Sequence, residues 1–242
     1  MMKLGMCGFT IGARAYYRQF NVVEVQQTFY DPPPIATLRR WRADAPPHFE
    51  FTLKAWQVIT HFSTSRTYRR LRSHFPEYAR SEAGGFRLND TVFAAWLTTL
   101  DCAQLLKATA ILFQCPASFR PAPDALAAMR EFFRHIDRPP GIRLLWEPRG
   151  DWPDETIQSM CQELDLIHAV DPFIRPSLTP EVIYWRLHGN RSHYASYTDT
   201  ELRRIYAWLP DDDRDAYVMF NNIPRVTDIR RFRELAPSGR AA

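Results

Sequence analysis

The sequence predicts an eight-stranded β/α barrel that occupies residues 1–242 as a single domain. Eight short runs of apolar residues alternate with segments of helical periodicity, and each strand and helix together take roughly 30 residues. The length of 242 residues is close to the usual size of such a barrel, about 250 residues. No glycine-rich phosphate loop follows the first run, which disfavours a doubly wound open sheet.

The expected strands are short and apolar, as strands that are covered on both faces usually are. Val182, Ile183, Tyr184 and Trp185, for example, are β-branched or aromatic, and Gly189 ends that run. In chain order, strands are expected at residues 3–7, 21–26, 49–55, 109–114, 142–147, 166–170, 182–188 and 216–221.

Helices are expected between these strands, and several carry start signals. Pro34 and Pro153 stand where two helices begin, a position that proline favours, and Asn89 or Asp90 caps a third. The apolar side of that third helix is expected at Val92, Phe93, Trp96, Leu97 and Leu100. In chain order, helices are expected at residues 13–20, 35–43, 90–106, 124–135, 153–164, 199–209 and 227–235.

Three segments depart from the regular alternation. Residues 60–90 form a long basic connection, which is either a lid over the barrel mouth or a solvated face. Residues 171–180 leave little room for a helix, so the sixth unit is expected to be irregular. The tail at 237–242 is expected to be frayed. The long connection contains six arginines, at positions 66, 69, 70, 72, 80 and 87.

Composition and charge exclude several classes of protein. The hydrophobic content of 45% is enough for a substantial core. No apolar run approaches the roughly 18 residues of a membrane span, and no secretory signal is recognisable, so we expect a cytoplasmic protein without membrane contact. The four cysteines are scattered and are expected to be buried thiols. The net charge of +4 favours an anionic partner, although arginine is spread along the chain and not gathered in one stripe.

The candidate site is organised around Arg186. With a period of two residues, Tyr184, Arg186 and His188 share one face of a buried strand. A guanidinium buried there without partners would be strongly destabilising, so this face must open onto a polar site to which other strands contribute. In a β/α barrel such a site lies at the C-terminal ends of the strands.

Polar or charged residues stand at the C-terminal ends of nearly all the expected strands, which predicts one shared pocket. Those expected to carry the chemistry are Glu24, Lys54, Glu147 and His188. Those expected to bind the substrate are His61, Gln114, Arg149, Asp171, Arg186, Tyr197, Asn221 and Asn222.

The roles within this set stay open. Glu24 and Glu147 could act as acid and base, because two carboxylates that face one pocket tend to have their pKa values pushed apart. Glu24 could instead only neutralise Lys54 or Arg186. Lys54 is expected to clamp negative charge, and to act as a nucleophile only if an apolar pocket lowers its pKa. A divalent metal on Glu24, Glu147, Asp171 and His188 is conceivable, but neighbouring cations already neutralise these acids, so neither a metal nor an organic cofactor is expected.

Six segments, in this order along the chain, together carry a family resemblance. They are residues 22–30, residues 49–55 with 60–61, residues 112–119, residues 146–149 with Trp152, residues 184–189 and residues 220–222. They resemble the domain-of-unknown-function 72 family, also called YecE-like. The resemblance implies a TIM-type barrel in a cytoplasmic prokaryotic protein. It also places all the candidate residues except Asp171 and Tyr197 at motif positions of the family, and it implies no particular reaction.

The chain departs from the family after the first expected strand. The family usually continues there with a Gly-Trp-Ser-Tyr type of motif, whereas residues 8–14 read Gly-Phe-Thr-Ile-Gly-Ala-Arg and the segment is much shorter. The pocket wall that this loop forms is therefore expected to be reduced or rebuilt.

These residues predict an enzyme, a hydrolase, lyase or isomerase, that acts on a small anionic or polyhydroxylated substrate by acid/base chemistry. One alternative is a nucleic-acid-binding protein that uses residues 66–87, with Tyr68 and Phe86 as exposed aromatics. A second alternative is a barrel that binds a metabolite without catalysis.

Overall fold

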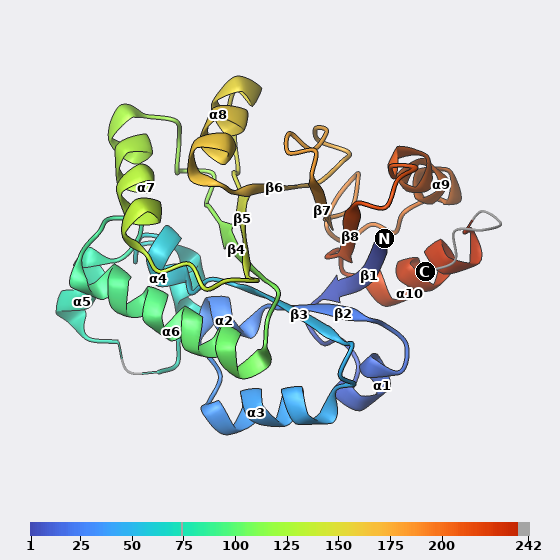
Figure 1. The fold of residues 1–242 in the computed structure, drawn as a ribbon, viewed down its shortest axis with the longest axis horizontal. Helices are drawn as coiled ribbons and strands as arrows, with labels where there is room; N and C mark the ends of the chain where they lie inside the picture. Colours follow the sequence, from blue (N-terminus) through green and yellow to red (C-terminus); the bar gives the residue numbers. More distant parts are fainter. Residues whose placement is uncertain (74, 237–242) are drawn as a thin grey trace.

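The computed structural model describes residues 1–73 and 75–236, so the predicted fraying of the tail at 237–242 lies outside the described residues. Eight parallel strands pair in chain order, and β8 pairs with β1 to close a barrel (Figure 1). The predicted β/α barrel is therefore confirmed. The strands are β1 (Met2–Cys7), β2 (Val22–Val25), β3 (Glu50–Lys54), β4 (Ala110–Gln114), β5 (Arg143–Glu147), β6 (Ile167–Val170), β7 (Val182–Leu187) and β8 (Asp215–Phe220).

Helices surround this barrel, and all seven expected helices occur within a few residues of their predicted ends. They are α1 (Ala13–Tyr17), α3 (Ile35–Asp44), α6 (Asp90–Leu106), α7 (Pro123–His135), α8 (Asp154–Leu164), α9 (Asp199–Trp208) and α10 (Arg225–Glu234). The described residues also form short helices that the sequence did not predict, which are α2 (Gln27–Tyr30), α4 (Gln57–Thr60), η1 (Arg66–Arg70) and α5 (Glu77–Glu82). The long connection is consequently more regular than predicted.

Two apolar layers hold the barrel together. Inside the barrel, inward-facing residues such as Leu112, Leu145 and Tyr184 form a small core. Outside, the opposite faces of the same strands pack against the helices in a much larger core that includes Phe113 and Trp146. This alternation along each strand is the period of two that the sequence predicts. All four cysteines are buried free thiols, as predicted.

Helix α6 shows one error in the predicted core. Val92, Trp96 and Leu100 are buried as expected, but Phe93 is 37% exposed and Leu97 is 44% exposed. The buried stripe also includes Ala95, Thr99 and Ala103. The buried face of α6 is therefore rotated by about one residue from the predicted one and leaves out Phe93 and Leu97. Small residues let α6 approach its neighbours closely, and the two large side chains lie on the edge of that contact.

The sixth crossover lacks a helix, as predicted. Residues 171–181 run from β6 to β7 as loop, and β6 makes only two register pairs with each neighbouring strand. A groove of about 560 Å³ lies beside this loop, over the outward-facing Ile183 and Trp185 of β7. Within the part of the chain that the structure describes, no helix is both long enough and apolar enough to cross a membrane.

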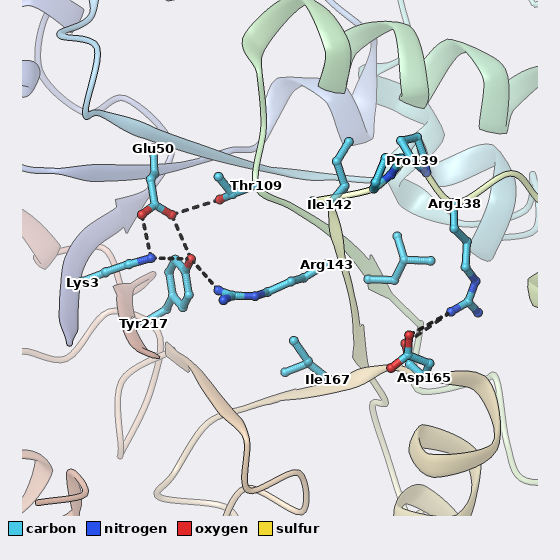
Figure 2. Close-up of a pocket in the computed structure, with 13 residues that line it drawn as sticks. Lys3, Glu50, Thr109, Arg138, Pro139, Ile142, Arg143, Asp165, Ile167 and Tyr217 are labelled. Atoms are coloured by element: carbon cyan, nitrogen blue, oxygen red, sulfur yellow. Dashed lines mark hydrogen bonds and ion pairs between the residues drawn. The ribbon is translucent and has the colours of Figure 1, made fainter. Parts of the chain in front are cut away.

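The N-terminal ends of the strands are closed by a network of paired charges (Figure 2). Lys3 lies 2.6 Å from Glu50, and Arg143 lies 2.8 Å from Asp215. The hydroxyl of Tyr217 joins the two pairs, because it accepts hydrogen bonds from Lys3 and Arg143 and donates one to Glu50. An open cavity of about 530 Å³ lies against this network. Since these charges satisfy one another, we assign the network to the stability of the barrel base.

Candidate active site

Four strands deliver charged side chains to the opposite, C-terminal end of the barrel. Glu24 on β2, Lys54 on β3, Glu147 on β5 and Arg186 on β7 are all buried. Each is two residues beyond an inward-facing position of its strand, so the strand pleat turns each one towards the barrel axis. The chain thus brings together residues that are up to 162 positions apart.

The guanidinium of Arg186 occupies the centre of this cluster and is 1% exposed. Its Nε and Nη2 donate to the carboxylate of Glu24 at 2.8 to 3.2 Å, and its Nη1 donates to Glu147 Oε2 at 2.6 Å. Nη2 also lies 3.7 Å from the sulfur of Cys7. β2 and β5 therefore supply the partners that a buried arginine requires. This confirms the prediction that other strands contribute to the polar site around Arg186.

A second group of side chains lies at the rim of the cluster. Arg149 forms an ion pair with Glu147, with Nη2 2.9 Å from Oε1, and the same nitrogen donates to His188 Nε2 at 2.6 Å. Because both guanidiniums near Nε2 can only donate, that nitrogen of His188 accepts and the ring proton is on Nδ1. Nδ1 lies 3.5 Å from Asp171, whose carboxylate also accepts a hydrogen bond from the backbone N–H of His188.

Both carboxylates of the cluster have lowered pKa values. Burial alone would raise the pKa of Glu147, but the charges of Arg149 and Arg186 outweigh burial and hold it at about 2. The pKa of Glu24 is likewise lowered, because Arg186 overcomes the effect of burial. Both are therefore ionised at neutral pH, and the expectation that one of them serves as an acid does not hold in this arrangement.

Lys54 has a different environment from that of the two arginines. Burial, reinforced by the positive charge of Arg186, lowers the pKa of its amine to about 7. Nζ donates a hydrogen bond to the side-chain oxygen of Gln114 and lies 3.7 Å from the ring centre of Phe29. With a pKa of about 7 the neutral amine is populated at neutral pH, because of burial and of the nearby Arg186 charge, and not because the pocket is wholly apolar.

A family model described as "Protein of unknown function DUF72" matches residues 13–240 of the chain. The chain belongs to the DUF72 family. A DUF72 protein from Enterococcus faecalis has a similar structure, with a TM-score of 0.72, 17% identity, and 97% of each chain covered. A search of curated proteins found no match.

Proteins outside DUF72 share the fold at lower similarity. A D-psicose 3-epimerase has a TM-score of 0.54 and 13% identity over 100% of this chain and 93% of its own. Endonuclease IV from Thermus thermophilus has a TM-score of 0.55 and 10% identity over 96% of this chain and 98% of its own. At these identities the likeness concerns the fold alone.

His61 and Gln114 lie next to Lys54 in this DUF72 site. Gln114 is the hydrogen-bond acceptor of the amine, and it stands opposite Glu147 in the register of β4 and β5. His61 packs its ring against Phe29, and its Nδ1 is 2.8 Å from the hydroxyl of Thr60. Burial lowers the pKa of His61 to about 3, so its ring is neutral.

Three other candidates have structural contacts instead of contacts with the charged cluster. Tyr197 is buried beneath Phe173, and its hydroxyl accepts a hydrogen bond from the N–H of Gly189. Asn222 is buried and donates to Asp228 on α10. Asn221 donates its backbone N–H to the carbonyl of Leu187. Tyr197 and Asn222 therefore support the loops after β7 and β8.

Sequence reasoning missed the supporting residues of the site. Tyr184 donates to Glu24 Oε2 at 2.9 Å and shares a hydrogen bond of 2.8 Å with Thr52. Gln26, which the sequence did place beside Glu24 at the end of the second strand, also donates to the carboxylate of Glu24. The period of two did place Tyr184 on the face of Arg186, and this signal could have identified it. No comparable signal pointed to Phe29 beside Lys54.

The long basic connection lies against the strand ends on the side of β2 and β3. The guanidinium of Arg70 stacks at 3.6 Å on the ring of Tyr30, and the backbone N–H of Arg72 donates to Asp31. Tyr68 and Phe86, which were expected to be exposed, are buried because they pack into the core beside α4 and α7. The exposed aromatic surface proposed for nucleic acid is therefore not formed by these two residues.

The free space at the rim is small. A cavity of about 70 Å³ lies among Glu147, Arg149, Asp171 and His188, which is below the size of typical small-molecule sites. Arg149, whose side chain is 33% exposed, is one of the residues that line this cavity. Among residues 1–73 and 75–236, no three His, Cys, Asp or Glu side chains converge closely enough to hold a metal ion.

Proposed function

We propose that the chain is an enzyme that acts by acid/base chemistry on a small anionic or polyhydroxylated substrate at the C-terminal ends of the strands. The observation that carries this proposal is the buried cluster of Glu24, Lys54, Glu147 and Arg186, which four strands bring to one place. Burial of so many charges is costly for stability, and clusters of this kind are concentrated at functional sites.

In this proposal Lys54 is the group that accepts a proton from the substrate. Its neutral form is populated near pH 7, where a general base is most effective. Glu24 and Glu147 are ionised and hold Arg186 in position, so they shape the field of the site and do not exchange protons. Arg149 binds negative charge on the substrate, because it is the more exposed of the two arginines.

The reaction class that fits a neutral base best is isomerase or lyase, since many reactions of both classes begin with removal of a proton from carbon. The shared fold of the D-psicose 3-epimerase, which was crystallised in the presence of D-fructose, supports a polyhydroxylated substrate within this proposal. Hydrolysis remains a prediction of the sequence for which the site offers no additional support. No cofactor is part of the proposal.

A proton-exchange experiment tests the function without knowledge of the substrate. Small aldoses, ketoses and their phosphates are incubated with the protein in D₂O, and deuterium on carbon is measured by NMR. We expect exchange with at least one compound, and a loss of about 100-fold or more in Lys54→Met, because the base is absent. Lys107→Met, which alters an exposed lysine, is the matched control. Exchange that persists undiminished in Lys54→Met would remove Lys54 from this role.

The nucleic-acid alternative is tested by oligonucleotide binding to the wild type and to variants in which Arg66 and Arg69 are replaced by alanine. The fold shared with endonuclease IV is the observation that favours this alternative. The burial of Tyr68 and Phe86 counts against it, because buried rings cannot stack on nucleic-acid bases. Affinity for oligonucleotides that falls steeply with salt and requires Arg66 and Arg69 would favour it. Binding of a sugar or sugar phosphate without any turnover would favour the non-catalytic barrel.

A further inference from the structure

Lysine is rare in this chain, and one of the few lysines lies in the site. Of the 31 lysines and arginines, only Lys3, Lys54 and Lys107 are lysines. Lys3 belongs to the charge network at the opposite end of the barrel, and Lys107 is exposed. Among the described residues, the ion pairs of the site are made by Arg149 and Arg186. A cation that only had to bind negative charge could have been arginine here as well, whereas arginine cannot supply a neutral amine.

Lys54 forms no salt bridge with the described residues. Within the described residues, no carboxylate oxygen lies within 4.0 Å of Nζ, although Glu24 and Glu147 occupy the same cluster. Nζ has a neutral acceptor in Gln114 and faces the aromatic ring of Phe29. Arg186 takes the carboxylates instead, and its positive charge disfavours a proton on Lys54. A buried lysine beside a second cation is an arrangement that activates the amine as a nucleophile.

We propose that Lys54 is a nucleophile that captures the carbonyl carbon of the substrate as an imine, on the strength of its buried position against Phe29 and Gln114 and its lack of a carboxylate partner. The inference rests on the proposed function and narrows its substrate class to small carbonyl compounds. An aldehyde or ketone group that carries a neighbouring carboxylate or hydroxyl group fits the arginines of the rim.

The imine forms without an oxidant or reductant. The lone pair of Nζ forms the C–N bond, the carbonyl C–O bond breaks, and the oxygen leaves as water. Both protons of the amine and one proton from solvent are distributed over the protonated imine and that water molecule, which balances the reaction. The protonated imine then acts as an electron sink, so the adjacent carbon loses its proton more easily. Once its nitrogen is part of the imine, Lys54 no longer serves as the base, and the water molecule released on imine formation accepts this proton in its place. The isomerase or lyase step of the proposed function would follow from this intermediate.

Reductive trapping tests this inference. The full chain is incubated with glyoxylate or with dihydroxyacetone at pH 7, sodium borohydride is added, and labelled lysines are located by peptide mass spectrometry. We expect the label on Lys54 to form about tenfold or more faster than that on Lys107, because an ordinary lysine is almost fully protonated at this pH. Lys107 serves as the internal reference in the same sample. Lys54→Arg, which keeps a positive charge, is expected to lose the label, and circular dichroism checks its fold.

The outcomes separate this inference from the proposed function. Selective labelling of Lys54 with either probe supports the imine. Labelling of Lys107 as fast as Lys54, or no label on Lys54 with both probes, overturns it. If Lys54 takes no label but Lys54→Met abolishes proton exchange, Lys54 acts as a base and the proposed function holds without the imine. If exchange is absent in the wild type while Lys54 is labelled, the nucleophile stands and the proposed reaction fails.

Discussion

Arg186 on β7 and Glu24 on β2 form an ion pair with three donor contacts in the interior of the barrel, 2.8 to 3.2 Å long. Glu147 completes the arrangement from the other side of the guanidinium. Two negative charges on one positive charge leave a surplus that Arg149 offsets at the rim. Each charge in the cluster is therefore held by neighbours from other strands, and removal of any one has consequences for the rest.

Removal of Arg186 should be strongly destabilising. Arg186→Met leaves Glu24 without a cationic partner in the barrel interior, and we expect the free energy of unfolding to fall by about 3–5 kcal/mol. Urea denaturation at pH 7 measures the change. Arg14→Met is the matched control, because that guanidinium is 80% exposed and its loss should cost less than about 1 kcal/mol. Equal effects of the two substitutions would mean that the cluster contributes nothing special to the fold.

Glu147→Gln should abolish turnover and leave the fold intact, with an effect on stability that depends on pH. The pKa of Glu147 is about 2 in the folded protein and near 4.5 when unfolded, so its stabilisation is present above pH 4.5 and is lost as the pH falls towards 2. We expect the stability difference between wild type and variant to shrink by roughly 3 kcal/mol between pH 6 and pH 2. Urea midpoints across this range test it. A constant difference would show that Glu147 is not held in its charged form.

Lys54→Met should have the opposite dependence on pH. The folded protein lowers the pKa of Lys54 from 10.5 to about 7, so the unfolded chain binds more protons between these values and wild-type stability rises with pH there. We expect the free energy of unfolding of the variant to be about 2 kcal/mol higher than that of the wild type at pH 6, and this difference to vanish towards pH 10. Thermal unfolding of both proteins at four pH values measures this gap. If the variant were less stable than the wild type at pH 6, burial of the Lys54 amine would not be destabilising.

Tyr217→Phe should weaken the closed end of the barrel without an effect on the active site. The hydroxyl of Tyr217 joins Lys3, Arg143 and Glu50, and its removal should lower the unfolding free energy by about 1–3 kcal/mol (Figure 2). Tyr194→Phe, at a tyrosine that is 80% exposed, should be neutral. Proton exchange and Lys54 labelling should be unchanged in both. A loss of labelling in Tyr217→Phe would mean that the two ends of the barrel are coupled.

The sequence was sufficient to predict the barrel and the four charged residues of its interior. The alternation of short apolar runs and helical segments predicted the eight strands, and the period of two predicted that Glu24, Lys54, Glu147 and Arg186 point inwards. These are local patterns that depend on backbone geometry, which a single sequence records directly.

The pairing of these residues could not be predicted. The chain holds enough acids to neutralise both Lys54 and Arg186, and only the angles between strands decide that Arg186 takes the carboxylates. Phe29 lies on α2, a helix of four residues that is too short for an apolar period to reveal. The burial of Tyr197 depends on Phe173, which reaches it from the loop after β6.

The irregular sixth unit has a consequence for how the closed pocket can admit a ligand. β6 is the weakest member of the barrel wall, since it has few ladder pairs and no helix in its crossover to β7. The bond from the His188 N–H to Asp171 links the ends of these two strands. We expect local opening of the barrel to begin between β6 and β7. The separation of these two strands would then also widen the entrance to the pocket.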